Sequence, residues 1–303
     1  MKEKILNLRN VLIAIGISAF FYIIFMLYVN GISSFIISPK AFALILSFLI
    51  LAMSFKGMRW LYLLNNACSE KINYFKSLII HFSSFSFIIT PGKAGDILKS
   101  WMMKKSCGTS HSEVLPVIFM ERLTDIISLS LLSFLWFFKY GKISYFVFLI
   151  FLIFFGFFLL NNERIQGFLN RKFLKTKDAL QTFKKLSNFK IVFISSFLDT
   201  LAWIFDALIF LVILEINGVK INIFIALSMY AFSILLGALS FIPGGLGSTE
   251  ITMAAILKGY LNLSDKLIFK IVLETRFYTL WLSIFIGLVF LLIYKNFEWG
   301  ISS

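Results

Sequence analysis

Seven charged residues lie in stretches of sequence that are apolar enough to sit inside a lipid bilayer. They are Glu121, Arg122, Asp125, Asp199, Asp206, Glu274 and Arg276. On insertion scales a charged side chain at the centre of a membrane helix costs about 2.5–3.5 kcal/mol, so seven unpaired ones would cost on the order of 20 kcal/mol. Such residues are expected to face a protein interior or a wet cavity, where they pair with one another, bind an ionic ligand or carry protons.

The spacing of these residues indicates which of them act together. Glu121 and Asp125 are four residues apart and share a helix face, with Arg122 at its edge. Asp199 and Asp206 also share one face, together with Trp203. One interpretation is that buried ion pairs fix a helix bundle, and Asp199 fits that role most easily. The other is that arginines bind an anionic headgroup while the acids balance the site or carry protons.

In the second half of the chain, Glu274 and Arg276 point to different sides of one helix. We therefore expect Arg276 to reach an acid on another element, and the candidates are Glu250 and Asp96. Lys93 is a further candidate for the headgroup site.

Two proline–glycine motifs, TPGKAGD (90–96) and FIPGGLGSTE (241–250), interrupt apolar stretches. The predicted turn residues are Pro91, Gly92, Gly95, Pro243, Gly244, Gly245 and Gly247. About thirty residues after Pro91 comes a charged apolar segment, ERLTD. A similar distance after Pro243 comes a second one, ETRFYTLW. Irregular backbone at membrane depth is tolerated only where protein buries it or where it lines a polar cavity. We expect two re-entrant helix pairs whose tips meet; eight full spans with short polar turns are the competing topology.

The composition places these motifs in a polytopic membrane protein. Of 303 residues, 59% are hydrophobic and 38 are phenylalanines, and the mean hydropathy is +0.91. A soluble domain cannot cover that much apolar surface. The net charge of +14 does not indicate nucleic acid, because eight basic residues cluster between Arg164 and Lys190, as in cytoplasmic loops that contact anionic lipid.

We predict an all-α fold with about six full transmembrane helices plus two re-entrant or broken helix pairs. The full spans are Val11–Val29, Ala41–Leu64, Val114–Phe138, Tyr145–Leu160, Ile191–Leu214 and Leu267–Tyr294, and the broken stretches begin with Tyr74–Thr90 and Ile223–Ile242. The positive-inside rule puts both termini in the cytoplasm and assigns Lys56, Arg59 and Lys99 to the cytoplasmic side.

The chain is interpreted as one membrane domain, residues 1–303, made of two inverted repeats, 1–140 and 141–303. Inverted repeats with paired discontinuous helices are typical of secondary transporters. Residues 163–190 are predicted to form an amphipathic segment on the cytoplasmic leaflet, because apolar residues recur there at helical spacing between lysines.

No pattern in the sequence indicates an enzyme, a metal site or a cofactor. There is no serine–histidine–acid set, no metal cluster and no phosphate-binding loop. His81 and His111 have no ligand spacing and are expected at the membrane interface, and Cys68 and Cys107 are expected to be free thiols.

Four segments, TPGKAGDILKSW, MERLTDIISL, FIPGGLGSTE and RFYTLWLSIFIG, resemble the signatures of the lysylphosphatidylglycerol synthase transmembrane region, also called the flippase-like domain family. In bifunctional members a lipid-moving membrane domain precedes an aminoacyl transferase domain. The chain stops at Ser303, so the resemblance implies the stand-alone form without synthase activity. It marks as functional Pro91, Gly92, Gly95, Glu121, Arg122, Asp125, Pro243, Gly244, Gly245, Gly247, Glu250 and Arg276. Asp96 stands where glutamate is commoner, and Lys93 where arginine is commoner.

These observations predict a lipid translocase of the cell (inner) membrane that binds an anionic polar or isoprenoid-linked lipid between the two Pro-Gly hairpins. The candidate substrate-binding residues are Lys93, Asp96, Glu121, Arg122, Asp125, Glu250, Glu274, Arg276 and Tyr278. One alternative is a non-transporting accessory protein that delivers lipid to a separate transferase. The other is an intramembrane lipid-modifying enzyme with Glu121 and Asp125 as an acid–base pair. Membrane lipids are the expected partners, and nucleic acid is not.

Overall fold

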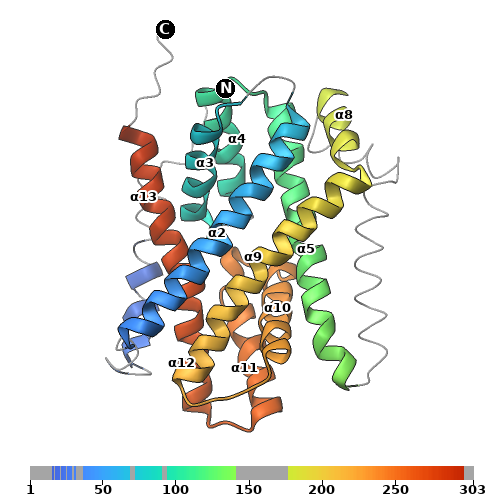
Figure 1. The fold of residues 1–303 in the computed structure, drawn as a ribbon. Coiled ribbons are helices and arrows are strands. Elements are labelled where there is room, and N and C mark those ends of the chain that lie inside the picture. The colour runs from blue at the N-terminus through green and yellow to red at the C-terminus, as the bar shows by residue number, and fades with distance from the viewer. Residues whose placement is uncertain are drawn as a thin grey trace.

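A computed structural model of the chain describes residues 37–68, 72–90, 94–140 and 177–296, together with scattered positions between 16 and 31 (Figure 1). Several predicted features lie outside these residues: Pro91, Gly92, Lys93, the span Tyr145–Leu160, the first half of the segment 163–190, and both chain ends. The backbone of Gly95 and Asp96 is described, but the Asp96 side chain is not.

Every regular element in the described residues is a helix. In chain order they are α2 (Pro39–Ala67), α3 (Tyr74–Ser83), η2 (Ser84–Phe87), α4 (Ala94–Cys107), α5 (His111–Tyr140), α8 (Lys177–Leu186), α9 (Phe189–Ile216), α10 (Ile223–Leu239), η5 (Pro243–Gly245), α11 (Ser248–Leu261), α12 (Asp265–Arg276), η6 (Phe277–Trp281) and α13 (Leu282–Asn296). Three helical stretches are long and apolar enough to cross a membrane: Pro39–Ala67, Phe189–Ile216 and Asp265–Asn296. The predicted all-α integral membrane protein is confirmed at this level.

Polar residues at the connections determine where the long helices begin. The Ser38 hydroxyl accepts from the backbone N–H of Ala41 at 3.2 Å, and Pro39 occupies the first turn of α2. Asn188 and Asn222 cap α9 and α10 in the same way, each accepting a backbone N–H at 2.9 Å. These caps explain why α2 and α9 each begin two residues before the apolar stretch that predicted them.

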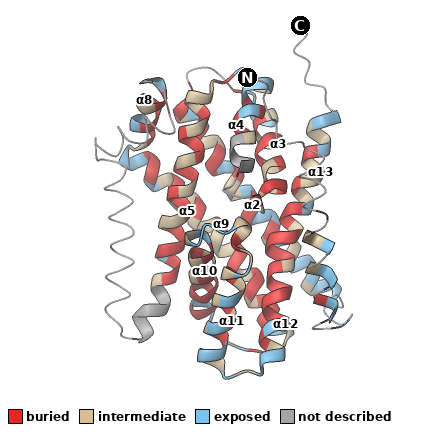
Figure 2. Cartoon of the chain, turned by 180° about the vertical axis from the view of Figure 1, so that it is seen from behind, coloured by how far each residue is buried: buried red, intermediate tan, exposed pale blue. Residues whose placement is uncertain are grey.

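The outer faces of the long helices carry large apolar side chains, as a lipid-facing surface requires. They include Phe42, Ile50 and Leu51 on α2, Phe189, Phe193 and Phe197 on α9, and Phe285, Val289 and Leu292 on α13. Figure 2 shows buried residues along α5 and α10, whereas the connection between α11 and α12 is exposed. A soluble monomer rarely exposes apolar surface on this scale, so the arrangement fits a bundle solvated by lipid.

α2 and α9 pack side by side and run in opposite directions (Figure 1), and we call the place where Phe55 meets Phe205 the α2–α9 crossing. Phe55 of α2 stacks on Phe205 of α9 with ring centroids 5.7 Å apart. One residue further along each helix, Lys56 Nζ lies 2.6 Å from Asp206 Oδ2. These contacts join the two halves of the chain.

The two broken segments lie in opposite ends of the bundle, α3 and α4 in one and α10 and α11 in the other (Figure 1). Each packs against a long helix of the other half of the chain. The first, through α3 and η2, contacts α13, whereas α10 contacts α5. The predicted interruption of the second stretch is seen as the Pro243–Gly245 turn that follows α10. In the first stretch a 3₁₀ turn at Ser84–Phe87 follows α3, and Pro91–Lys93 of the predicted break lie outside the described residues.

Close backbone approach at Gly287 brings α13 against the first broken segment. A Cβ atom at Gly287 would lie 2.9 Å from the carbonyl carbon of Phe85 and still closer to the backbone nitrogen of Ser86. Helices that pack this tightly in membranes use small residues, since only these let the backbones approach.

We expect Gly287→Val to destabilise the protein by about 1–3 kcal/mol, because the added side chain overpacks the contact with η2. The free energy of unfolding, measured by titrating detergent-solubilised protein with sodium dodecyl sulfate, checks this. Gly259→Ala on α11 is the control, because no atom lies within 4 Å of its added Cβ. Equal effects of the two substitutions would contradict the close packing.

Candidate functional site

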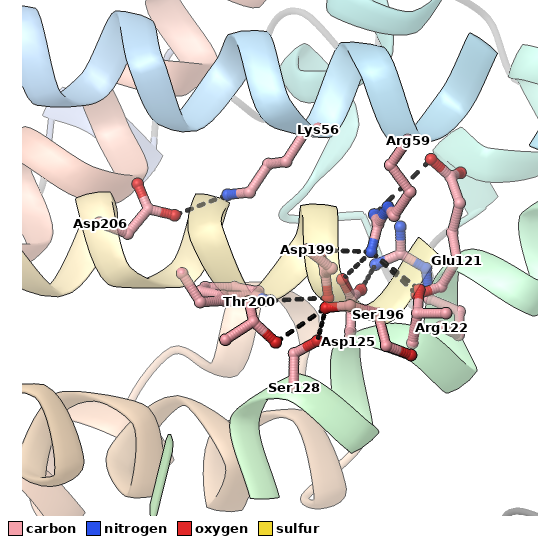
Figure 3. Close-up of polar contacts among 12 residues, drawn as sticks. Lys56, Arg59, Glu121, Arg122, Asp125, Ser128, Ser196, Asp199, Thr200 and Asp206 are labelled. Atoms are coloured by element: carbon pink, nitrogen blue, oxygen red, sulfur yellow. Dashed lines mark hydrogen bonds and ion pairs between the residues drawn. The ribbon is translucent and has the colours of Figure 1, made fainter. Parts of the chain in front are cut away.

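Arg59 is the centre of a buried group of charges between α2, α5 and α9 (Figure 3). The residue is 2% exposed. Its Nη1 lies 2.7 Å from Asp125 Oδ1 and also contacts Asp199 Oδ1, while Nη2 lies 3.7 Å from Glu121 Oε1. Nη1 donates further to the Thr124 hydroxyl at 3.0 Å. One guanidinium from α2 therefore holds carboxylates of two other helices.

Lys99 supplies a second cation to the same group. Its Nζ lies 2.8 Å from Glu121 Oε2 and 3.5 Å from the centre of the Trp60 ring, a cation–π contact. Trp60 is fixed in turn because its indole N–H donates to the Ser77 hydroxyl at 2.8 Å. The Lys99–Glu121 pair holds α4, which follows the first Pro-Gly motif, against α5.

The Lys56–Asp206 pair extends the charges along α2 and α9. Lys56 Nζ lies 4.4 Å from the centre of the Trp203 ring, and the Trp203 N–H donates to Asp199 Oδ2 at 3.2 Å. The predicted shared face of Asp199, Trp203 and Asp206 is confirmed, and this face is turned toward α2.

Arg122 is the most accessible cation of the group. Its Nη1 lies 2.8 Å from Asp125 Oδ2, one turn along α5, and its side chain is 36% exposed. The Arg59 side chain, in contrast, is 3% exposed. Asp125 thus accepts from a buried arginine on one oxygen and from a partly exposed arginine on the other.

These residues form one charge-balanced set, which we call the central ion network. Among the residues the structure describes, its cations are Lys56, Arg59, Lys99 and Arg122 and its anions are Glu121, Asp125, Asp199 and Asp206. Ions removed from water need compensation by opposite charges and hydrogen bonds. Equal numbers of each sign satisfy that need and make the interior of the bundle polar.

A second ion pair braces the tip of the other broken segment. Arg276 Nε lies 2.7 Å from Glu250 Oε1, and Arg276 Nη2 donates to the Gly244 carbonyl at 2.6 Å. The other Glu250 oxygen accepts the Gly247 N–H at 2.6 Å. The predicted pairing of Arg276 with Glu250 is confirmed, and Glu250 lies in the first turn of α11 as expected.

The tip that Arg276 holds reaches the first broken segment. Gly244 has φ +62°, a conformation that favours glycine, and an added Cβ would lie 2.9 Å from Ile89 Cγ2. Ile89 directly precedes Thr90 and the first Pro-Gly motif. The second Pro-Gly turn therefore touches the end of the first broken stretch.

Glu274 and Tyr278, also predicted as site residues, have other surroundings. Glu274 Oε2 accepts from Asn217 Nδ2 at 2.7 Å, and Lys270 Nζ lies 3.8 Å from Oε1. Tyr278 is buried in the apolar core with its ring centre 5.2 Å from that of Phe277. In the described part of the chain, neither forms an ion pair or side-chain hydrogen bond with the central ion network.

Sequence reasoning missed Lys56, Arg59 and Lys99, which the positive-inside rule had assigned to the cytoplasmic side. In the structure these cations lie against other helices of the bundle, because four acids on α5 and α9 make positions away from water favourable for them: Glu121, Asp125, Asp199 and Asp206. The sequence did contain a sign that two of these cations lie inside the bundle, because Lys56 and Arg59 fall within the predicted span Ala41–Leu64. His81, which was expected at the membrane interface, is buried inside the bundle beside Glu121.

A comparison with protein-family models gives one match, to the lysylphosphatidylglycerol synthase TM region, over residues 11–287. The match includes the central ion network and both Pro-Gly motifs. No curated protein matches the chain.

Arg59→Met should destabilise the protein by about 3–5 kcal/mol, because three buried carboxylates lose their shared partner. The free energy of unfolding in detergent measures the loss. Lys258→Met removes a cation from an exposed pair with Asp265, whose side chains are 65% and 66% exposed, and should cost about 0–1 kcal/mol. A loss below that of the Lys258 variant would show that Arg59 does not hold the network together.

Proposed function

Since the chain belongs to the lysylphosphatidylglycerol synthase transmembrane-region family, we propose that it binds an anionic polar or isoprenoid-linked lipid by its headgroup and translocates that lipid across the cell membrane. The family indicates a lipid-related function in a membrane. Headgroup binding and transport are the steps that the geometry of the described residues supports.

Matched helix lengths support an architecture of two inverted repeats. α2 has 29 residues and α9 has 28; α4 and α11, which follow the two Pro-Gly motifs, have 14 residues each. The next stretch is 30 residues in α5 and 32 residues from Asp265 to Asn296. The order of long, broken, short and long elements is therefore the same in both halves.

Contacts between corresponding residues support the same architecture. Lys56 and Asp206 occupy the same position in their helices, 17 residues after Pro39 and Phe189. Phe55 and Phe205, one residue earlier, also contact each other. A residue that touches its own counterpart lies on a two-fold axis, and in inverted repeats this axis runs in the membrane plane. We infer that the α2–α9 crossing lies near the bilayer midplane.

The contact of Gly244 with Ile89 is the observation that carries the proposed headgroup site, because it brings the two broken segments together. Discontinuous helices that meet near the midplane form the substrate sites of many transporters. In our proposal the headgroup enters between the two hairpins, where Lys93 and Asp96 adjoin the first tip and Arg276 the second. The partly exposed Arg122 donates hydrogen bonds to the anionic group, as arginine does to phosphate.

In the proposed transport cycle the lipid tails stay in the bilayer while one half of the bundle rocks against the other. The α2–α9 crossing is the contact about which the halves turn. We place both termini in the cytoplasm, as the positive-inside rule predicts, and a separate transferase is a candidate partner that would use or supply the lipid. Glu121 and Asp125 both pair with Arg59, which supports a non-enzymatic role for these two acids over an acid–base pair.

Arg122→Gln should abolish selective retention of an anionic lipid, because it removes the accessible cation and leaves the buried pairs in place. Native mass spectrometry of the protein purified from membranes identifies the retained lipids, and we expect at least a fivefold loss of the anionic species. Lys258→Gln, an exposed cation far along α11, is the matched control. If wild type and Arg122→Gln retain the same unselective lipids, the headgroup site is wrong. A lipid retained selectively but not moved in proteoliposomes would instead favour the accessory role.

A further inference from the structure

His81 on α3 is buried in the bundle at 2% exposure, inside an aromatic enclosure. The imidazole stacks on Trp60 with ring centres 5.5 Å apart, and it forms T-shaped contacts with Phe82 and Phe85, whose ring centres lie 5.5 and 5.3 Å away. This enclosure separates the ring from lipid and holds it against the central ion network.

Both ring nitrogens of His81 lack a hydrogen-bond partner among the described residues. Nδ1 lies 3.8 Å from Glu121 Oε1, and this oxygen also accepts no hydrogen bond. The other Glu121 oxygen is bound to Lys99 at 2.8 Å. A buried polar atom without a partner costs about 1–3 kcal/mol. Two such atoms that face each other less than 1 Å beyond hydrogen-bond distance are therefore poised to pair.

We propose that His81 is a proton-binding site of the protein, and that protonated His81 and Lys99 are alternative cationic partners of Glu121. The proton arrives from water and binds to the free imidazole nitrogen. The resulting N–H donates to Glu121 Oε1 when the ring closes the gap. Lys99 keeps its own proton and leaves Glu121, so the carboxylate exchanges one positive partner for another.

The charged groups that face His81 explain why the two partners alternate. Lys56 and Arg59 approach from α2, Lys99 from α4, and Glu121 and Arg122 from α5. α13, which also packs against α3, meets it with Phe290 against Phe82. Burial away from water and, after it, the nearby cations make a positive charge on the ring unfavourable while Lys99 stays in place. Departure of Lys99 restores the balance and favours the imidazolium.

The exchange would link protons to transport, and this consequence rests on the proposed function. Lys99 lies on α4, directly after the first Pro-Gly motif, where the headgroup is proposed to enter. A Lys99 side chain released from Glu121 carries one positive charge toward an anionic headgroup. One proton bound at His81 then accompanies each negative charge that enters the site.

The chain contains only two histidines, so ¹⁵N-histidine NMR can observe His81 directly. His111→Gln removes the other signal; His111 lies apart from the network, with Nδ1 2.9 Å from the Ser100 hydroxyl. In phosphatidylcholine nanodiscs, Lys99→Met on this background should raise the His81 titration midpoint by at least one pH unit, a tenfold gain in proton affinity. Adding Glu121→Gln should abolish that rise. Lys105→Gln, which removes an exposed cation from the same helix, should leave the midpoint unchanged.

The proposal is overturned if the midpoint stays where it was in folded Lys99→Met protein, or if it rises equally with Glu121→Gln present. Lys99→Gln, which can still donate to Glu121, replaces Lys99→Met if the latter does not fold. The readout needs neither transported lipid nor a bound headgroup. Wild-type protein that retains no anionic lipid selectively would therefore count against the proposed function, whereas an unmoved His81 signal would count against the proton site alone.

Discussion

The bundle depends on the need to neutralise charge away from water. The single guanidinium of Arg59 contacts carboxylates from both α5 and α9. Lys99 adds a cation from α4, and Lys56 pairs with an acid further along α9. Removal of any member leaves an opposite charge buried, so the helices are held in one register by more than apolar packing. Helices in lipid gain little from the hydrophobic effect when they associate, and buried ion pairs and hydrogen bonds are therefore effective in specifying their arrangement.

The same compensation leaves part of the interior of the bundle polar. The Pro-Gly turn is not helical, and no helix partner satisfies the Gly244 carbonyl. Arg276 donates a hydrogen bond to that carbonyl, so the irregular backbone is tolerated inside the protein. The Pro-Gly turn is thus partly buried, at Gly245, and braced by Arg276. Its contact with Ile89 brings two breaks in the chain, far apart in sequence, to one place. An amphiphile that crosses a bilayer needs such a polar region reachable from the hydrocarbon side.

The sequence predicted the helical class, the four long helices that the structure describes to within about three residues at each end, the break at Pro243–Gly245, and Glu250 as one of two candidate partners of Arg276. Helical periodicity and apolar length are local properties, and a carboxylate in the first turn after a Pro-Gly motif is readable in the same way. The roles of Lys56, Arg59 and Lys99 were not readable, because a lysine near the end of an apolar stretch looks the same whether it meets water or an acid on another helix. His81 was missed for the same reason: only the packing of α3 on α2 shows that its ring lies between Trp60 and Glu121. The counts of spans and repeats depend on residues outside those that the structure describes.

The crossing of α2 and α9 also constrains the history of the chain. Phe55 on Phe205 is a like-with-like contact, which two identical subunits in opposite orientations would form as readily as two linked halves. The contact of Lys56 with Asp206 joins two different residues, so two identical subunits could not form it in the same way. In a homodimer of one ancestral half, the lysine would face a second lysine, or the aspartate a second aspartate, in a medium where like charges repel strongly. If the two halves are the inverted repeats proposed above, the present pair requires that the two copies differ in sequence. Two copies fused in one polypeptide are free to differ in this way, and they can therefore form an ion pair at a position where exact symmetry forbids it.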